Sequence, residues 1–283
     1  MARRTYVLPS SLDGVRLDQA LAALAPGLSR RSARELIAQG AVYVGGRRCR
    51  VVSRPVGAGA AIAVEEPGRF PVGGDIRVTV LWRGDGMVAL DKPAGVPLVP
   101  TKSSVVGTVL HALAHELGRP LATLFPVHRL DTPTSGVALV ASDRSAAGRF
   151  SEALREGRVR KNYLAWVMGR PVESEGEWTW PLSEARAGLV RVEAAGRPAT
   201  TRYEVLESRP GRTLLELWPE TGRTHQLRVH CATAGYPILG DRKYGGPAAS
   251  LALRALLHAR RIAFPLSSGR EQTVEAPLPP DMA

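Results

Sequence analysis

HRLDTPTSG, at residues 128–136, places one carboxylate on a short turn between two apolar segments. Residues 124–127 precede it and residues 137–141 follow it, and both segments have the length and composition of buried strands bounded by turn residues. Because an unpaired carboxylate is costly to bury, Asp131 at the rim of a buried sheet needs a partner. An isolated turn aspartate ordinarily accepts hydrogen bonds from nearby backbone N–H groups, and this interpretation stands unless a cation is found for Asp131.

A candidate cation lies far along the chain in TGRTHQLRVH, at residues 221–230. The pattern there predicts a helix from about Thr224 to a stop at Gly235. Arg223 would then lie at the start of the helix, where backbone N–H groups point outward and favour negative charge. An arginine in that place can hold a carboxylate ionised by charge pairing and hydrogen bonding. An arginine that binds surface acids or a helix end is the ordinary alternative, and the sequence does not show that Arg223 meets Asp131.

Further motifs follow in a fixed order along the chain. They are LDKPAG at residues 90–95, RKNYLA at 160–165, LGD at 239–241 with YG at 244–245, and LHA at 257–259. Together with the two stretches above, they resemble the pseudouridine synthase family that modifies large-subunit ribosomal RNA and some transfer RNAs. The resemblance covers nearly the whole chain. It departs from many members at residues 132–133, where Thr-Pro replaces a charged or polar pair and leaves the aspartate in place.

The resemblance implies an isomerisation of uridine. Making pseudouridine breaks the N1–C1′ bond, turns the uracil and rejoins it through C5, so nothing is oxidised, no group is lost, and no cofactor or metal is required. The family depends on one essential aspartate, which corresponds to Asp131. Its carboxylate could attack C6 of the uracil or C1′ of the ribose, or assist proton removal from the sugar, and the sequence does not choose among these. Arg223 matches the arginine that pairs with this aspartate.

The resemblance also assigns residues to the bound RNA. Tyr163 matches a ring that packs against the target base, and stacking on an extruded base contributes about 1–3 kcal/mol. Arg129 matches an arginine that enters the RNA stack in some relatives as the uridine leaves. His128 is expected to contact substrate, and Leu227 to form an apolar wall of the pocket. An ordinary sheet tyrosine and a core leucine are the alternatives for Tyr163 and Leu227.

The composition favours a polyanionic partner. The 283 residues suffice for one large domain or two smaller ones, and 38 Lys and Arg against 26 Asp and Glu give a formal net charge of +12. Part of the arginine excess can also reflect genome composition. Cys49 and Cys231 form neither a metal pattern nor a disulfide framework, and no signal peptide or membrane span is visible. We therefore expect a cytoplasmic protein, without membrane contact, that works as a monomer.

The basic residues are concentrated between Leu28 and Arg54, where seven arginines face a single acid. They are Arg30, Arg31, Arg34, Arg47, Arg48, Arg50 and Arg54. The pattern predicts two helices, the second capped by Ser29, and then a hairpin that turns at Gly45–Gly46. Arg30, Arg31 and Arg34 share the start of the second helix. The arrangement resembles the small alpha-L RNA-binding module, and a merely solvated basic face is the alternative.

A segment rich in Pro and Gly at residues 65–74 has the composition of a linker, so we place a domain boundary near Gly73. Residues 1–72 are expected to form the small basic RNA-binding domain with its linker, and residues 73–283 the catalytic domain. Strands and helices then mix without regular βαβ alternation. The sequence therefore predicts an α+β fold, a mixed and largely antiparallel sheet flanked by helices.

Three other functions remain to be compared with this interpretation. His111 and His115 lie four apart on a predicted helix, but the order of a zinc hydrolase motif and a third ligand are missing. A phosphatase that uses an aspartate would need a second aspartate two residues beyond Asp131. An RNA-binding protein without catalysis is the third. The sequence favours an RNA pseudouridine synthase, and the basic module favours structured large-subunit ribosomal RNA over transfer RNA as its substrate.

Overall fold

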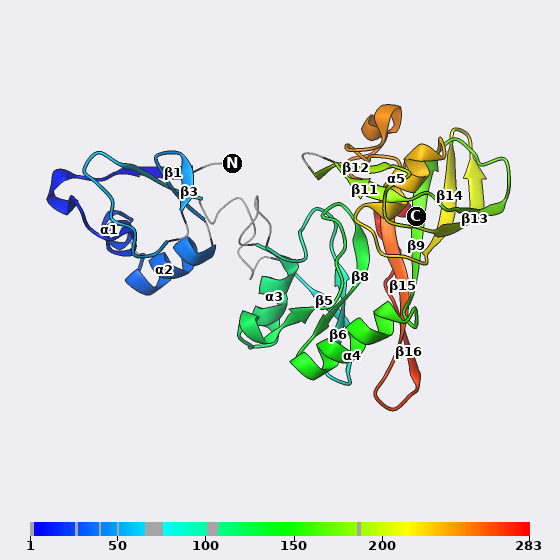
Figure 1. Ribbon diagram of the computed structural model, residues 1–283, viewed down its shortest axis with the longest axis horizontal. Helices are drawn as coiled ribbons and strands as arrows, with labels where there is room; N and C mark the ends of the chain where they lie inside the picture. Colours follow the sequence, from blue (N-terminus) through cyan, green and yellow to red (C-terminus); the bar gives the residue numbers. More distant parts are fainter. Residues whose placement is uncertain are drawn as a thin grey trace. The chain divides into compact units, whose positions relative to one another are not determined.

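The computed structural model describes residues 3–25, 28–39, 41–49, 51–65, 76–100, 107–185 and 188–283. The chain divides into two compact units, drawn in Figure 1. The first contains Met1–Arg77 and Pro100–His115, and the second contains Val78–Val99 and Glu116–Ala283. The expected boundary near Gly73 lies outside the described residues.

The amino-terminal part of the first unit has the predicted helix–helix–hairpin order. Its elements are β1 (Arg3–Val7), η1 (Ser10–Leu12), α1 (Leu17–Leu24), α2 (Arg30–Gln39), β2 (Val42–Val44), β3 (Arg47–Cys49) and β4 (Ala61–Glu65). The strands form an antiparallel sheet in the order β1-β4-β2-β3. Gly45 and Gly46 both have positive φ, at 57° and 76°, which a two-residue hairpin turn of this type requires. Helix α3 (Val109–Glu116) lies further along the chain.

The second unit is built on one sheet of ten strands, in which β15 (Leu257–Pro265) lies between β9 and β8. The strand order is β10-β13-β14-β9-β15-β8-β6-β5, with β16 paired to β15 and β7 paired to β8. The strands are β5 (Thr79–Gly84), β6 (Met87–Lys92), β7 (Phe125–Pro126), β8 (Ser135–Ala141), β9 (Arg160–Met168), β10 (Glu175–Trp178), β13 (Thr201–Arg209), β14 (Arg212–Pro219), β15 and β16 (Glu271–Glu275). Within this sheet, every pairing is antiparallel except the one between β15 and β8. The predicted α+β fold with a mixed, largely antiparallel sheet is confirmed.

The remaining elements of this unit lie outside the large sheet. They are α4 (Arg144–Arg155), α5 (Gln226–Thr233), the small hairpin β11 (Leu182–Glu184) and β12 (Val190–Val192), and the 3-10 turns η2 (Leu121–Thr123), η4 (Gly246–Ser250) and η5 (Pro280–Met282).

Strand β8 is the most deeply buried strand of the sheet, because all seven of its residues are buried. On one face, Phe150 of α4 packs with Leu139 of β8 and Phe264 of β15. Beside β9 and β14, Leu227 of α5 belongs to a second apolar cluster with Leu215. A strand buried this fully has a continuous apolar run instead of alternation, as residues 137–141 do.

The start of β8 is held against β15 with no space for a side chain. Ser135 pairs with His258, and Gly136 pairs with Ala259. Gly136 has φ of 107°, and a Cβ on it would lie 2.2 Å from the carbonyl oxygen of Ala259. Only glycine fits this position, and it fixes where the preceding loop ends.

We expect Gly136→Ala to lower the free energy of unfolding by at least about 3 kcal/mol, because the methyl group must displace backbone at a φ that alanine disfavours. Gly148→Ala is the matched control: Gly148 is exposed in α4, and its Cβ would meet open space. That change should instead stabilise the protein by about 0.5–1 kcal/mol. Urea unfolding of both variants measures the difference, and equal effects would contradict the account of the β8–β15 junction.

Candidate active site

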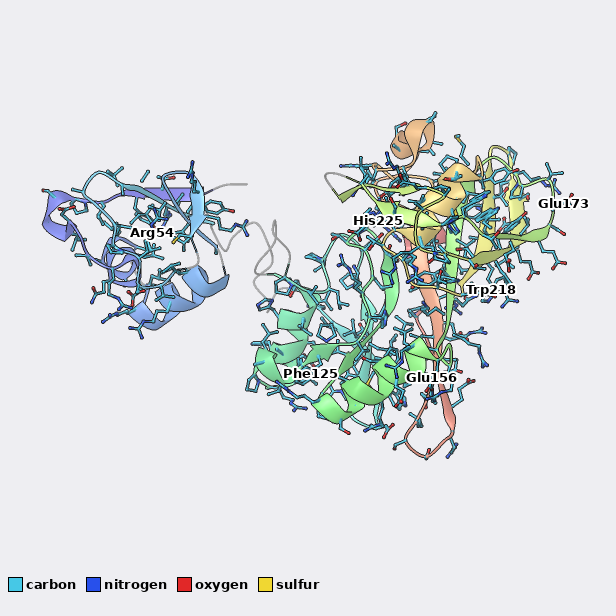
Figure 2. All side chains as sticks on the ribbon, viewed as in Figure 1. Arg54, Phe125, Glu156, Glu173, Trp218 and His225 are labelled. Atoms are coloured by element: carbon cyan, nitrogen blue, oxygen red, sulfur yellow. The ribbon has the colours of Figure 1, made fainter. Side chains whose placement is uncertain are left out.

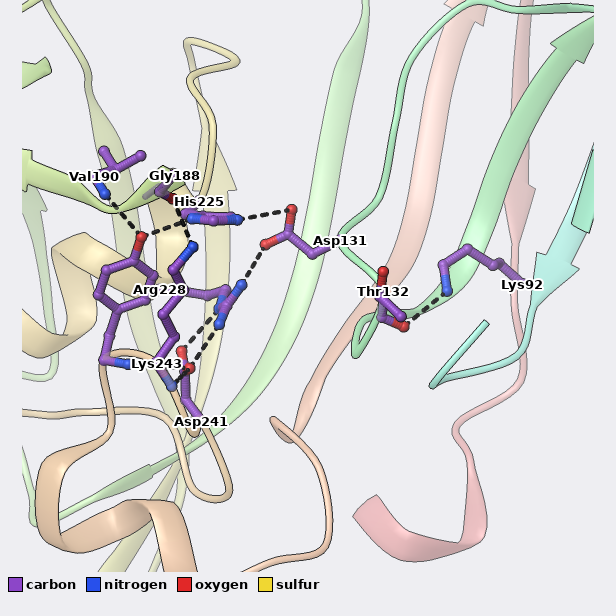
Figure 3. Close-up of polar contacts among 10 residues, drawn as sticks. Lys92, Asp131, Thr132, Gly188, Val190, His225, Arg228, Asp241 and Lys243 are labelled. Carbon is purple, nitrogen blue, oxygen red and sulfur yellow. Dashed lines mark hydrogen bonds and ion pairs between the residues drawn. The ribbon is translucent and has the colours of Figure 1, made fainter. Parts of the chain in front are cut away.

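Asp131 lies on the loop between β7 and β8 and is held by an arginine of helix α5 (Figure 3). Arg228 Nη1 donates to Asp131 Oδ2 over 2.9 Å. Arg228 also donates from Nε and Nη2 to the two carboxylate oxygens of Asp241, at 2.8 and 2.7 Å. A guanidinium clamped on one side by a bidentate pair has little freedom, so its remaining edge points at Asp131.

Arg228 and Asp241 form a pair that we call the clamp. The clamp is almost completely buried, so each of its charges is stabilised by the other. The Arg228 and Asp241 side chains are 7% and 1% exposed, and Asp131 is 18% exposed. Burial acts to raise the pKa of Asp241, but Arg228 and the backbone N–H groups of Lys243 and Tyr244 hold that pKa below its ordinary value. Burial acts to lower the pKa of Arg228, and Asp241 and Asp131 together raise it above its ordinary value. Both members of the clamp are therefore ionised.

The predicted pairing of Arg223 with Asp131 is corrected to Arg228. Arg223 Nε donates to the carbonyl oxygen of Pro198 over 2.9 Å, and its side chain has no ion pair with Asp131. The helix begins at Gln226, two residues later than expected, because His225 takes a left-handed conformation with φ of 54°. A sequence signal for Arg228 existed: it stands between Leu227 and Val229 on a helix that is buried at all three positions, where an arginine requires a carboxylate.

His225 is a second polar neighbour of Asp131 that the sequence interpretation missed. Its Nε2 lies 3.9 Å from Asp131 Oδ1, and its Nδ1 lies 2.7 Å from the Tyr244 hydroxyl. That hydroxyl accepts the backbone N–H of Val190 over 3.0 Å. Donation of the Tyr244 proton to Nδ1 leaves the other ring nitrogen, Nε2, carrying its hydrogen toward Asp131. Burial lowers the pKa of His225, although the charge of Asp131 acts to raise it. The lowered pKa favours the neutral form of the ring.

A buried lysine fixes the other side of the loop. Lys92, at the end of β6, is 0% exposed and donates from Nζ to the carbonyl oxygens of Pro93, Val96 and Thr132, at 2.8, 2.7 and 3.2 Å. Burial lowers the pKa of Lys92 to about 7, while the charge of Asp131 acts in the opposite direction. The three carbonyl oxygens match the three N–H bonds of an ammonium group. Lys92 therefore ties the residue after Asp131 to the turn of the LDKPAG motif.

A pocket with a volume of about 240 Å³ opens over Asp131. Its lining includes all six site residues predicted for the second unit, which are His128, Arg129, Asp131, Tyr163, Arg223 and Leu227. Figure 2 labels Trp218 and His225, which come before and after the turn that carries Arg223 along the chain. The expected convergence of distant motifs on one pocket is thus observed, although Arg223 lines it without touching Asp131.

The side chains around this pocket differ in their surroundings. Burial, and then the charge of Asp131, raise the pKa of Tyr163 above its ordinary value, so its ring stays neutral. Leu227 is 6% exposed and supplies an apolar surface. Arg129 is exposed, and its guanidinium has no hydrogen-bond or ion-pair partner among the described residues. An unpaired arginine beside a pocket is free to bind a ligand.

His128 anchors the loop to the sheet. Its Nε2 accepts the backbone N–H of Leu139 over 2.9 Å, and its ring stacks on Phe150 with centroids 6.2 Å apart. Burial, followed by the charge of Lys161, lowers the pKa of His128 to about 4. The predicted contact between His128 and substrate remains a prediction, and the structure assigns its Nε2 to the backbone of β8.

In the first unit, two of the predicted basic residues, Arg30 and Arg34, gather with Arg16 around a buried aspartate. Asp18 is 0% exposed and accepts hydrogen bonds from Nε of Arg16, Arg30 and Arg34, at 3.2, 3.0 and 2.8 Å. Burial acts to raise the pKa of Asp18, and these three arginines hold it well below its ordinary value. The Arg30 and Arg34 side chains stay 48% and 51% exposed. The side chain of Arg31 lies outside the described residues.

The alternative of a zinc hydrolase depends on His111 and His115. His111 Nδ1 lies 2.7 Å from the Thr108 hydroxyl, and His115 is exposed. Within the described ranges, no group of three His, Cys, Asp or Glu side chains could hold a metal ion. The helices of the same ranges include none with the length and apolar character needed to span a membrane.

Comparisons with known proteins match both parts of the chain. Residues 86–233 match the family described as RNA pseudouridylate synthase, and residues 15–62 match the S4 domain. The first match contains Asp131, Tyr163 and Arg228. The second contains Asp18 and its arginines.

Curated relatives cover nearly the full length. The chain is 37% identical over 291 residues to an uncharacterized RNA pseudouridine synthase of Chloroflexus aurantiacus, covering 99% of this chain and 91% of that protein. It is 35% identical over 295 residues to ribosomal large subunit pseudouridine synthase D of Nitrosomonas europaea, covering 98% and 85%. Among solved structures, human RNA pseudouridylate synthase domain containing 1 is similar with a TM-score of 0.62 at 27% identity, over 73% of this chain and 86% of that one.

The clamp predicts that replacing Arg228 lowers the free energy of unfolding more than replacing Arg223, an arginine of the same motif. Arg228→Met leaves the buried carboxylate of Asp241 without its cation, and we expect a loss of about 3–5 kcal/mol in the free energy of unfolding. Arg223→Met removes one hydrogen bond to a backbone carbonyl and should cost no more than about 1.5 kcal/mol. Urea unfolding compares the two, and an equal or reversed order would contradict the assignment of Arg228 as the clamp.

The lowered pKa of His128 predicts a loss of stability in acid. The unfolded chain binds a proton near pH 6.5 and the folded chain only near pH 4, so this contribution is present above pH 6.5 and lost as the pH falls to about 4. His128→Gln keeps an acceptor for the Leu139 N–H without titrating. Its free energy of unfolding should therefore fall less over that range, by up to about 3 kcal/mol. Parallel pH dependences for wild type and variant would rule out this role.

Proposed function

The chain belongs to the RNA pseudouridylate synthase family, and we propose that Asp131 is the carboxylate with which this enzyme isomerises uridine in RNA. The observation that carries the proposal is the Asp131–Arg228 ion pair at the base of a pocket that Tyr163 and Leu227 also line. An aspartate that is ion-paired with an arginine and only partly exposed beside a pocket has the position of a catalytic group.

The overall reaction needs no oxidant and no second substrate. The N1–C1′ bond of uridine breaks, the C5–C1′ bond forms, C5 loses its hydrogen as a proton and N1 gains one. Asp131 could act by attack on C6, by attack on C1′ or by assisting proton removal from the sugar. Each route requires an ionised Asp131, and the Arg228 guanidinium at 2.9 Å and the His225 Nε2 at 3.9 Å lie beside its carboxylate oxygens.

The target uridine must leave its stack before it can enter the pocket. The neutral ring of Tyr163 and the apolar side chain of Leu227 offer surfaces for the extruded base, and stacking contributes about 1–3 kcal/mol toward the cost of unstacking. In this proposal Arg129, which is exposed and unpaired within the described structure, occupies the gap left in the RNA. These assignments follow the family resemblance residue by residue.

The S4 domain supports RNA as the partner of the first unit. The half-exposed guanidinium groups of Arg30 and Arg34 keep N–H donors for phosphates after their contacts with Asp18. Large-subunit ribosomal RNA is the proposed substrate, because one relative that covers 98% of this chain is named a ribosomal large subunit pseudouridine synthase. Transfer RNA is the second candidate. A monomer acting in the cytoplasm, without a cofactor, is the proposed working state.

Pseudouridine mapping tests the activity, the catalytic residue and the target together. RNA from a strain lacking this protein is treated with carbodiimide and read by reverse transcription after complementation with wild type, Asp131→Ala or Glu175→Gln. Glu175 is an exposed carboxylate on β10 and serves as the matched control. We expect a stop in large-subunit ribosomal RNA that wild type and Glu175→Gln restore and Asp131→Ala does not, while Asp131→Ala binds RNA as well as wild type.

The other outcomes each reject a different part of the proposal. A restored stop in transfer RNA would replace the substrate and keep the chemistry. Turnover by a correctly folded Asp131→Ala protein would remove Asp131 from its role. If wild type restored no stop in any RNA class, the activity in these RNAs would be rejected, and an RNA-binding protein without catalysis would be favoured.

A further inference from the structure

A second pocket adjoins the active-site pocket and shares the segment 222–224 with it. We call it the hairpin pocket, because β11 and β12 contribute to its walls. Its lining includes Glu184, Arg197, Arg223 and Thr224, around a volume of about 350 Å³. The sequence motifs do not assign a ligand to this pocket, and the proposed reaction does not use it.

Arg197 and Arg223 both line the hairpin pocket, and neither is paired with an acid among the described residues. Arg223 uses its Nε on the carbonyl oxygen of Pro198, and burial followed by the nearby charge of Arg197 lowers the pKa of Arg223. The Arg197 side chain is exposed and has no partner among the described residues. Glu184, the acid among the described lining residues, accepts the Thr224 hydroxyl over 3.0 Å and pairs with neither arginine.

This arrangement is one that an anion would stabilise. Two guanidinium groups held close together repel each other, and the repulsion is larger where one of them is partly buried. The guanidinium fork matches the oxygens of a phosphate, which can accept from both groups at once. The remaining N–H groups of Arg223 and all those of Arg197 are available for this contact.

We propose that Arg197 and Arg223 bind a phosphate of the RNA strand beside the target uridine. The inference rests on the proposed function, and it fits the geometry because the two pockets share the segment 222–224, so a strand that enters the active-site pocket can extend into the hairpin pocket. It gives Arg223, which does not touch Asp131, a role in positioning RNA. Inorganic phosphate offers the same chemistry from another source and is distinguished by the experiment.

The experiment compares single variants of the full-length protein on two readouts. Turnover is followed by tritium release from C5 of uridine in RNA of the strain that lacks the protein. Binding of a short fluorescein-labelled oligouridylate is measured as a function of KCl concentration. The variants are Arg197→Gln, Arg197→Lys, Arg223→Gln and Glu184→Gln. Arg191→Gln is the matched control, because Arg191 lies on the same hairpin but pairs with Glu193 at 3.1 Å.

We expect Arg197→Gln and Arg223→Gln each to raise KM about tenfold with kcat near that of wild type, and to reduce the salt slope of binding by about one. Glu184→Gln removes a negative charge near the phosphate and should lower KM. Arg197→Lys keeps the charge and should restore the salt slope. Arg191→Gln should match wild type in both readouts. Opposite effects of the arginine and glutamate variants would not result from a merely structural role.

Wild-type KM and salt slope in a folded Arg197→Gln protein would overturn the proposal, and this exposed position tests it even if Arg223→Gln does not fold. Binding of inorganic phosphate that Arg197→Gln abolishes, without any change in the RNA salt slope, would assign the pocket to the free ion and also overturn it. If wild type releases no tritium, the proposed function fails separately, while a reduced oligouridylate salt slope in Arg197→Gln would still support the phosphate site.

Discussion

One guanidinium shared by two carboxylates holds the active site together. Arg228 joins helix α5 to Asp241 by two hydrogen bonds and to the loop of Asp131 by a third. A buried cation needs more than one anionic oxygen to be stable. The carboxylate of Asp241 supplies two such oxygens to Arg228, so the pairing does not depend on Asp131 alone. Asp241 therefore meets the structural demand of Arg228, which leaves Asp131 oriented by the arginine but still open to the pocket. Lys92 restrains the same loop from the opposite side.

Local sequence signals predicted those parts of the structure that short stretches determine. The apolar run after Asp131 became the fully buried strand β8, and the pattern around Gly45–Gly46 became the hairpin of β2 and β3. Each of these depends on the spacing of neighbouring residues or on a positive φ that glycine supplies. The family motifs also identified six residues that line the pocket around Asp131 although they lie far apart in the chain, and their roles there stay predictions.

The partners within that pocket depend on helix phase and on long-range packing, which the sequence pattern did not provide. Because His225 has a left-handed backbone, α5 begins at Gln226, two residues later than predicted. With this start of the helix, Arg228 and not Arg223 faces Asp131. The buried Lys92 donates to three backbone carbonyl oxygens. The positions of carbonyl groups cannot be predicted from the pattern of side chains, so the role of Lys92 was not found from the sequence. Arg197 and Arg223 lie far apart in the chain, and they line one pocket together with residues of the small hairpin, which local patterns do not show.

The position of β15 in the sheet has a consequence for synthesis on the ribosome. Residues 79–141 supply the strands on one side of β15, and residues 160–219 supply those on the other. In the large sheet β15 (Leu257–Pro265) pairs with β8 and with β9, so the emerging chain cannot complete this sheet, or seat β8 beside its parallel neighbour, until that segment has left the exit tunnel. Until then each half exposes a strand edge, which makes this interval the time at which the nascent enzyme is most open to wrong pairing.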